Sequence, residues 1–365
     1  MEIKSQEKKE SNFINPELVK SKIEDKEQIF ILDVREEWEY ENWHIKESVN
    51  IPLMQLQQNI NKIPKDKEII TVCAHGVRSE QARQFLISNG YKAKTMYSGM
   101  VNWNSVYDIA EIQLNNKNIK VLQFRRIGKG CLSYLVINKD KALLIDPTID
   151  IEIFRKTGEE NNANIIAILD THTHADHVDG IIFFPYIKYI SPDSELKIKH
   201  GLIKNNQKII INDITIKTIS TPGHTPESMI YLLEDLAFTG DTLFIESIGR
   251  PDLNQDSKEN VSILFNTLHK KILTLPENTK ILPAHYSEKI KLEKNTPITS
   301  TLKELKENLN ILKLNKEEFI DFIIKNTNQK PENFEAIKKI NLGLIEADIE
   351  EIRELEAGPN RCAVS

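Results

Sequence analysis

Residues 171–180 read THTHADHVDG and place three histidines and two aspartates within ten positions. This stretch directly follows NIIAILD, an apolar run of the kind that fills a buried strand. Alternate side chains of an extended segment share one side, so His172 and His174 can face one metal ion. Asp176 and His177 follow as the chain turns. The pattern therefore predicts a metal site at the end of a strand.

Further metal-ligand residues occur later in the chain, each beside a predicted strand end or turn. They are His224 in TPGHTPES, Asp241 in FTGDTLF and His285 in LPAHY. Five of the nine histidines then belong to one predicted site. The alternative is a set of unrelated surface or core histidines, but such residues have no reason to gather at strand ends beside carboxylates. A metal centre is the stronger interpretation.

Length and composition indicate an ordinary globular chain that is long enough for two domains with separate chemical functions. At 365 residues the chain exceeds the usual size of one domain, so two domains are expected. With 40% hydrophobic residues, 28% charged residues and a net charge of -6, the composition favours small-molecule substrates over nucleic acid. A homo-oligomer is compatible with this composition.

The N-terminus and the cysteines point to a cytoplasmic protein. Residues 1–11 are polar where a secretory signal needs an apolar core, and no stretch approaches the length of a membrane span. The cysteines are Cys73, Cys131 and Cys362, an odd number spread far apart. This is a poor disulfide framework, so free thiols in a reducing compartment are expected.

The first third alternates apolar segments with helical ones, which predicts a parallel sheet flanked by helices. QIFILDV, IITVCA and KTMYSG are the predicted strands, and a helix is expected from about Ser79, as its cap, to Ser88. The chain becomes polar at residues 107–120, where we place the domain boundary. Further strands follow, and residues 301–356 show the pattern of amphipathic helices, clearest in LKELKENLNILKL.

The ordered set H-x-H-x-D-H, a later histidine, a GD aspartate and a PAH histidine resembles the metallo-β-lactamase superfamily over about residues 119–290. The resemblance implies an αββα sandwich with the metal at one edge. The superfamily contains both zinc hydrolases and iron oxygenases, so local context must decide the chemistry.

The segment AFTGDTLFIESIGRPDL resembles the persulfide dioxygenase branch, and the resemblance extends through HKKILTLP and PAH to NRCAV near the C-terminus. It implies one Fe(II) per chain, held by His172, His224 and Asp241. Two histidines and one carboxylate leave positions open for substrate sulfur and O2. Zinc is the alternative metal, with no redox chemistry of its own.

The resemblance also suggests roles for other residues. His174, Asp176, His177 and His285 would hold a second metal in a hydrolase, and in the dioxygenase branch they are expected to orient ligands and water. Arg250 of GRPD is expected near the thiol substrate, since a guanidinium can bind a carboxylate in two-point fashion; a plain ion pair is the alternative. Cys131 and Cys362 are expected to be inert buried thiols.

The upstream loop CAHGVRS places Cys73 between a predicted strand and a helix N-terminus. Backbone N–H groups and the helix dipole at such a loop stabilise an anion on sulfur, although a plain core cysteine is the alternative. With ILDVREEWEYENWHIKESVNIPL and MYSGMVNW, the loop resembles a single-domain rhodanese over about residues 12–106. The resemblance implies sulfur transfer through a Cys73 persulfide, held by the amides of residues 74–79, with Arg78 attracting anionic donors.

The sequence therefore predicts an α/β rhodanese-like domain (residues 12–106) and an αββα domain (residues 119–365) whose helical extension spans residues 301–356. The expected function is oxidation of a low-molecular-weight thiol persulfide, such as glutathione persulfide, by O2 to sulfite and thiol, coupled to sulfur transfer with sulfite or thiosulfate as products. One rival is a binuclear zinc thioesterase of the glyoxalase II type. Another is a sulfur-relay module whose metal is structural.

Overall fold

The fold was analysed in a computed structural model, which describes residues 12–184, 186–252, 257–287, 289–326 and 333–364. The polar N-terminal stretch 1–11 and residues 327–332 of the predicted helical extension lie outside these ranges. The chain forms two compact units. The first comprises essentially the residues up to Tyr107, with 126–129 and 357–359; the second takes the remainder. Each unit is described by itself.

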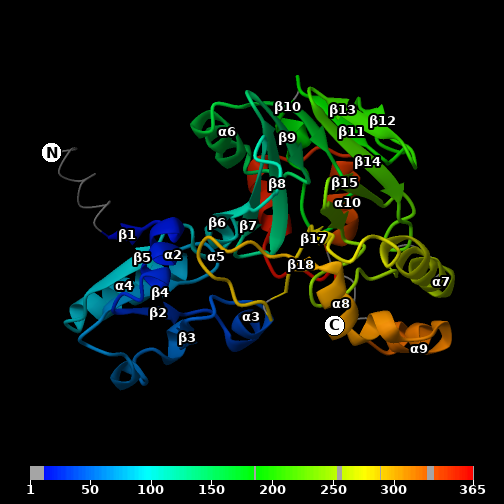
Figure 1. Cartoon of the computed structure of the whole chain (residues 1–365). Coiled ribbons are helices and arrows are strands. Elements are labelled where there is room, and N and C mark those ends of the chain that lie inside the picture. Colours follow the sequence, from blue (N-terminus) through cyan, green and yellow to red (C-terminus); the bar gives the residue numbers. More distant parts are fainter. Residues whose placement is uncertain (1–11, 185, 253–256, 288, 327–332, 365) are drawn as a thin grey trace. The chain divides into compact units, whose positions relative to one another are not determined.

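The first unit is built on a parallel sheet of five strands in the order β1-β5-β4-β2-β3 (Figure 1). Its strands are β1 (Phe13–Ile14), β2 (Ile29–Asp33), β3 (Ser48–Asn50), β4 (Glu68–Val72) and β5 (Ala93–Met96). Its helices are α2 (Pro16–Glu24), α3 (Glu37–Asn42), α4 (Val77–Ser88) and α5 (Gly99–Trp103), with 3₁₀ turns at Leu53–Gln55 and Ile60–Lys62.

Alternating side chains of this sheet enter two separate cores, which explains why helices cover both faces. Ile31 of β2 and Ile70 of β4 pack in a core with residues of α2 and α5. Their neighbours Leu32 and Ile69 pack on the other side with residues of α4. Successive strand residues point to opposite faces, so both faces must be covered. The predicted parallel sheet flanked by helices is confirmed.

The second unit contains two sheets. The first has the order β12-β11-β10-β9-β8-β7-β6 and the second β13-β14-β15-β16-β17-β18. The first sheet consists of β6 (Tyr107–Ile112), β7 (Ile119–Arg126), β8 (Cys131–Asn138), β9 (Lys141–Ile145), β10 (Asn164–Leu169), β11 (Lys188–Ser191) and β12 (Gly201–Leu202). The second consists of β13 (Lys208–Ile211), β14 (Ile214–Ser220), β15 (Met229–Leu233), β16 (Leu236–Gly240), β17 (Lys280–Pro283) and β18 (Ser300–Thr301).

The two sheets pack face to face, and helices cover their outer faces. Tyr134 of β8 and Phe238 of β16 meet in the core between the sheets, with ring centroids 5.1 Å apart. The helices are α6 (Ile151–Glu160), α7 (Ser257–Thr267), α8 (Leu302–Asn308), α9 (Lys316–Asn326), α10 (Phe334–Asn341) and α11 (Ile349–Glu356). Shorter turns lie at Gly180–Phe183, Leu268–Ile272 and Asn310–Lys313. The αββα sandwich with C-terminal helices is confirmed.

Three local predictions differ from the structure. Residues 107–120, expected to be a polar joint, contribute β6 and the first residues of β7. LKELKENLNILKL is broken: α8 ends before Leu309, whose extended backbone (φ -93°, ψ 98°) starts a 3₁₀ turn. The first-unit helix α4 begins at Val77 rather than at Ser79, with Gly76 as its N-cap. In the last case a glycine with φ 97° supplies the turn, so no capping hydroxyl is needed.

The topology of the second unit brings the candidate ligands to one edge. Asp241 directly follows β16 and His285 follows β17, and these two strands are parallel neighbours, so their ends coincide. The loop after β10 joins this edge through the Met229 N–H, which donates to the Thr171 carbonyl at 2.8 Å. None of the helices in the described ranges combines the length and apolar character that crossing a bilayer requires.

Candidate functional site

His172, His224 and Asp241 form the group that we call the ligand triad. Each is 2% exposed or less. Asp241 Oδ2 lies 3.8 Å from His172 Nε2 and 3.5 Å from His224 Nε2, and one ligand atom from each residue lies within 4.8 Å of the others. His172 Nε2 and Asp241 Oδ2 are buried without a hydrogen-bond partner among the described residues. Buried polar atoms are normally paired, so these atoms fit a metal ion as their partner.

The remaining polar side-chain atom of each triad residue, Nδ1 of each histidine and Oδ1 of Asp241, is held by a neighbouring polar atom. His172 Nδ1 lies 2.9 Å from Thr171 Oγ1, which in turn donates to Asp146 Oδ2. His224 Nδ1 lies 2.8 Å from the Arg250 carbonyl, so it must donate its proton there. Asp241 Oδ1 lies 2.6 Å from His285 Nδ1. These contacts leave both Nε2 atoms with lone pairs and Oδ2 free, as metal coordination requires.

Electrostatics supports the same protonation states. Burial lowers the pKa of His172 well below its ordinary value and also lowers the pKa of His224, so both rings are neutral near pH 7. Burial alone would raise the pKa of Asp241, but the charge of His285 outweighs it and the pKa falls. Two neutral imidazoles and one carboxylate are the donor set that suits a divalent transition metal.

His174 belongs to a different group. It forms a buried cluster with Asp146 and Asp170, to which it offers one ring nitrogen, and its Nε2 lies 3.4 Å from Asp146 Oδ1. The sequence pattern placed His172 and His174 together because they alternate along the chain. Their rings do lie close, with centroids 4.3 Å apart, but His174 is not part of the ligand triad.

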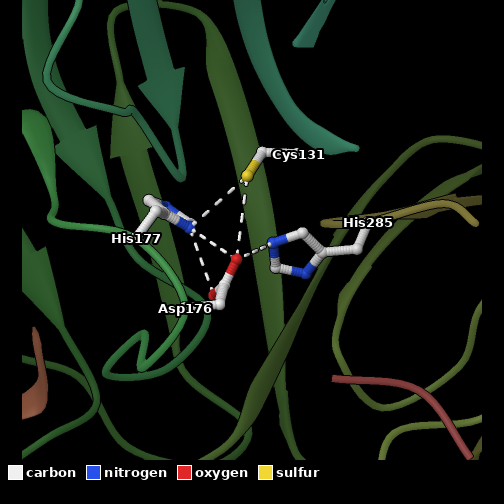
Figure 2. A group of neighbouring side chains, drawn as sticks. All are labelled: Cys131, Asp176, His177 and His285. Atoms are coloured by element: carbon white, nitrogen blue, oxygen red, sulfur yellow. Dashed lines mark hydrogen bonds and ion pairs between the residues drawn. The ribbon is translucent and has the colours of Figure 1, made fainter. Parts of the chain in front are cut away.

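Asp176, His177 and His285 gather instead around Cys131, and we call these four residues the thiol cluster. Figure 2 shows their side chains directed toward one another. Cys131 Sγ lies 3.7 Å from Asp176 Oδ2 and 3.8 Å from His177 Nδ1. Cys131 is buried, as expected, but polar ligand atoms surround its sulfur rather than apolar groups. Burial would raise the pKa of Cys131, yet His177 and His285 lower it to about 6.

The sequence did not indicate Cys131 as a site residue. It opens β8, 45 positions before Asp176, and reaches the cluster through an isolated bridge to His285. Cys362 also lies near the site, in a buried group with Asp241 and His285, since the C-terminal residues pair with the segment after β16. Burial raises the pKa of Cys362 well above its ordinary value, so this sulfur is a neutral thiol.

Arg250 is buried and already paired. Its guanidinium donates two hydrogen bonds of 2.7 Å to the Asp252 carboxylate and a longer one of 3.3 Å to the Arg361 carbonyl. Its backbone also carries the carbonyl that holds His224. The residue therefore lies beside the ligand triad, and its guanidinium is engaged by Asp252; its predicted place near the thiol substrate stays a prediction.

Cys73 lies in a separate site in the first unit, just beyond the end of β4. Its sulfur accepts a hydrogen bond from the Gly76 N–H at 3.1 Å and lies 3.4 Å from Ser79 Oγ. Ser79 Oγ also donates to the Gly76 carbonyl, so this hydroxyl braces the loop and does not cap the helix. The loop holds a sulfur at the N-terminus of α4, where the helix dipole favours an anion.

Arg78 and Gly99 support this loop from two sides. Arg78 pairs in two-point fashion with Glu39 of α3, at 2.6 and 2.8 Å. The N–H groups of Met100 and Val101 donate to the carbonyls of Cys73 and Ala74 at 2.9 and 3.2 Å. The approach is so close that a Cβ at Gly99 would lie 2.1 Å from the Cys73 carbonyl oxygen.

We expect Gly99→Ala to move the Cys73 loop and lower any Cys73-dependent sulfur transfer by about 10- to 100-fold, since a displacement near 1 Å has that effect on positioned groups. The assay is thiocyanate formation from thiosulfate and cyanide. Gly90→Ala is the matched control, because Gly90 also has positive φ (83°) but a Cβ there meets nothing within 4 Å. Equal losses in both variants would mean that backbone strain alone, not the contact with Cys73, is responsible.

Two family models match parts of the chain. The model of rhodanese-like domains matches residues 15–106, and that of the metallo-β-lactamase superfamily matches residues 126–188. The chain is a rhodanese-like domain followed by a metallo-β-lactamase domain. The rhodanese-like domain contains Cys73, and the metallo-β-lactamase domain contains the ligand triad and the thiol cluster.

The relatives of the metallo-β-lactamase domain include proteins named as a dioxygenase and proteins named as hydrolases. The mitochondrial persulfide dioxygenase of Bos taurus is 31% identical over 174 residues, which are 43% of this chain and 65% of the bovine protein. A hydroxyacylglutathione hydrolase of Dictyostelium discoideum is 33% identical over 174 residues, 44% and 63% of the two chains. A probable metallo-hydrolase of Bacillus subtilis (strain 168) is 29% identical over 196 residues, 46% and 92%. The chain thus spans less than two thirds of the first two relatives.

Solved structures show the same fold. A metallo-β-lactamase from Staphylococcus aureus has a TM-score of 0.58 and 28% identity, and the match covers 63% of this chain and 74% of that one. The ETHE1 protein from Myxococcus xanthus has a TM-score of 0.55 and 23% identity, with 61% and 98% covered. The domain is therefore related both to persulfide dioxygenases and to glyoxalase II-type hydrolases.

Proposed function

We propose that the metallo-β-lactamase domain is a persulfide dioxygenase, and that the rhodanese-like domain transfers sulfane sulfur through Cys73. The reaction consumes a thiol persulfide, O2 and water and yields the thiol and sulfite. The observation that carries the proposal is the composition of the ligand triad: two neutral histidines and one carboxylate, with His174 in another group. This set matches that of non-haem iron oxygenases.

The residues around the triad support a single metal there. His285 uses Nδ1 to hold Asp241 and directs Nε2 at Asp176, so it does not face the triad. A ferrous ion bound by the triad would supply oxygen-activating chemistry that zinc lacks. The chain itself holds the two rings in the required tautomers, keeps Asp241 anionic and buries the site from bulk water.

The Cys73 loop supports the second half of the proposal. The Gly76 N–H and the start of α4 stabilise negative charge on the Cys73 sulfur, and the same groups can hold a persulfide sulfur. Arg78 contributes positive charge at the loop while it is anchored by Glu39. The two domains would then act on the same small molecules, namely a thiol persulfide, sulfite and thiosulfate.

Oxygen consumption and thioester hydrolysis distinguish the proposal from its main rival. The hydrolase relative in Dictyostelium discoideum makes a glyoxalase II-type thioesterase the second candidate. The full chain should consume one O2 for each sulfite formed from glutathione persulfide and leave a glutathione thioester unreacted. Hydrolysis of the thioester without any persulfide-dependent O2 uptake would replace the dioxygenase proposal with the thioesterase.

Arg250 is proposed to bind the substrate from beside the triad, with Asp252 orienting its guanidinium. Arg250→Ala should raise KM for glutathione persulfide by about 10- to 100-fold while kcat changes little, the effect of losing a charged hydrogen bond. Asp252→Asn keeps the guanidinium and should raise KM less. An unchanged KM in Arg250→Ala, or equal iron loss in both variants, would assign Arg250 to holding the loop instead.

A further inference from the structure

The loop of residues 174–179, which we call the ligand loop, depends on the C-terminal helices for its shape. All of its residues are buried, and it contains neither a helix nor a strand. The backbone N–H and C=O groups of such a segment cannot pair in a regular ladder, so other parts of the chain must supply their partners. Two side chains, one at the end of α10 and one at the end of α11, bind four of these groups.

Asn341, the last residue of α10, makes three of these contacts. Its Nδ2 donates to the carbonyls of His174 and His177 at 2.9 and 2.8 Å, and its Oδ1 accepts from the Asp179 N–H at 2.8 Å. The residue is only 4% exposed. Both amide protons and the amide oxygen are thus used on one short loop. The contacts fix the loop near its start, its middle and its end.

Glu356, the last residue of α11, holds the ligand loop from a second helix. Its Oε1 accepts from the Val178 N–H at 2.6 Å, and the residue is fully buried. A carboxylate is unfavourable both in a buried position and at the C-terminal, negative end of a helix, so the local sequence gives no reason for a glutamate there. The hydrogen bond to the ligand loop gives such a reason.

Apolar side chains of the ligand loop pack on the same two helices. Val178 lies in a buried cluster with Ile340 of α10 and Ile352 of α11. Ala175 packs against Phe334, the first residue of α10. The helices therefore contact the loop through apolar packing as well as through hydrogen bonds, and their position determines where the loop lies.

Two further contacts connect the ligand loop to the ligand triad. Asp176 Oδ2 lies 2.8 Å from His285 Nε2 (Figure 2), and His285 Nδ1 lies 2.6 Å from Asp241 Oδ1. Asp241 is the carboxylate of the triad. A displacement of the loop would therefore move His285 and, through it, Asp241. Groups that orient a metal ligand in this way change metal affinity without touching the metal.

We propose that Asn341 and Glu356 are positioning residues for the metal centre, and that α10 and α11 are part of its support. Both residues would act through the ligand loop, on Asp176 and from there on Asp241. The sequence pattern indicated only amphipathic helices in this part of the chain. The inference concerns metal binding, so it holds for a dioxygenase and for a hydrolase.

Cobalt(II) titration of the full chain, stripped of metal and followed by visible absorbance, tests this role. Asn341→Asp keeps the shape and the acceptor but loses both donors, and it should weaken cobalt binding by about 10-fold or more. Asn333→Ala is the matched control, because Asn333 Nδ2 donates to the Leu355 carbonyl at 2.9 Å and so joins the two helices. The control should bind cobalt as the wild type does. Equal losses in both variants, or no loss in Asn341→Asp, would overturn the proposal.

Hydrogen exchange separates positioning from general stability. In Asn341→Asp the amides of Val178 and Asp179 should exchange faster, while α10 and α11 stay protected. Faster exchange throughout residues 334–356 would show that the helices had come loose, and it would contradict a specific action of Asn341 on the ligand loop.

Glu356 provides an independent pair of variants. Glu356→Ala removes the acceptor of the Val178 N–H and should weaken cobalt binding by about 10-fold, whereas Glu356→Gln keeps an oxygen there and should weaken it less. Equal affinities in the two variants would count against the proposal. Thermal unfolding checks each variant, and this pair decides the matter if Asn341→Asp does not fold. Cobalt replaces either iron or zinc, so a chain without O2 uptake can still give the expected result.

Discussion

Asp241→Asn should abolish iron binding and persulfide-dependent O2 uptake together. Asp241 is the anionic member of the ligand triad, and its Oδ2 has no hydrogen-bond partner in the described part of the chain. The amide keeps the shape but loses the charge. Iron affinity should fall at least about 100-fold, because even the loss of a hydrogen-bond partner to a ligand costs about 10- to 100-fold. Elemental analysis and an oxygen electrode measure the two losses.

Asp235→Asn is the matched control for this variant, because Asp235 lies just before β16, where it pairs with Lys280, while Asp241 lies just after it. The control should retain both iron and activity, and thiosulfate:cyanide sulfur transfer should be unchanged in both variants. Iron retained in Asp241→Asn with normal O2 uptake would mean that the triad was assigned wrongly.

Cys73→Ser should eliminate sulfur transfer, by on the order of 1000-fold or more, because it removes the proposed nucleophile. Iron content and O2 uptake should remain nearly unchanged, since the triad belongs to the other unit. The products should shift as well. Sulfite attacks the outer sulfur of a Cys73 persulfide, the S–S bond breaks, and thiosulfate leaves with the Cys73 thiolate restored. The variant should therefore release sulfite, with thiosulfate only at the level of the spontaneous reaction between sulfite and free persulfide.

Both products can be separated chromatographically during turnover, with a control for the spontaneous reaction of sulfite with free persulfide. Two sites on one chain raise each other's effective concentration, to about the millimolar range for a short linker. If the wild type and Cys73→Ser give the same thiosulfate fraction above that background, sulfite is not handed to Cys73. The rhodanese-like domain would then serve another donor or acceptor.

The strands could be predicted because their signals are local, whereas the set His172, His224 and Asp241 was implied by the family resemblance. Strand ends carry the ligand residues, and apolar runs such as NIIAILD mark the strands themselves. Alternation along an extended segment treats His172 and His174 alike, and it was the resemblance that separated them. In the structure, the tertiary positions of Asp146, after β9, and Asp170, after β10, place His174 in another cluster.

For Cys131 and Arg250, too, the local sequence did not reveal the contacts that each residue makes in the fold. The place of Cys131 depends on a bridge to His285, 154 residues later in the chain, which no local pattern reveals. Arg250 was predicted from its motif, but the motif does not show that Asp252 two residues later takes up its guanidinium. Contacts between distant segments, rather than the identity of the residues, were the missing information.

Metal replacement tests the central claim most directly. The full chain is stripped of metal without oxygen and reloaded with either Fe(II) or Zn(II), and O2 uptake with glutathione persulfide is then measured. If the ligand triad serves an iron-dependent dioxygenase, Fe(II) restores O2 uptake with matching sulfite formation and Zn(II) restores none. Thioester hydrolysis restored by Zn(II), with no O2 uptake in the iron-loaded protein, would contradict the account.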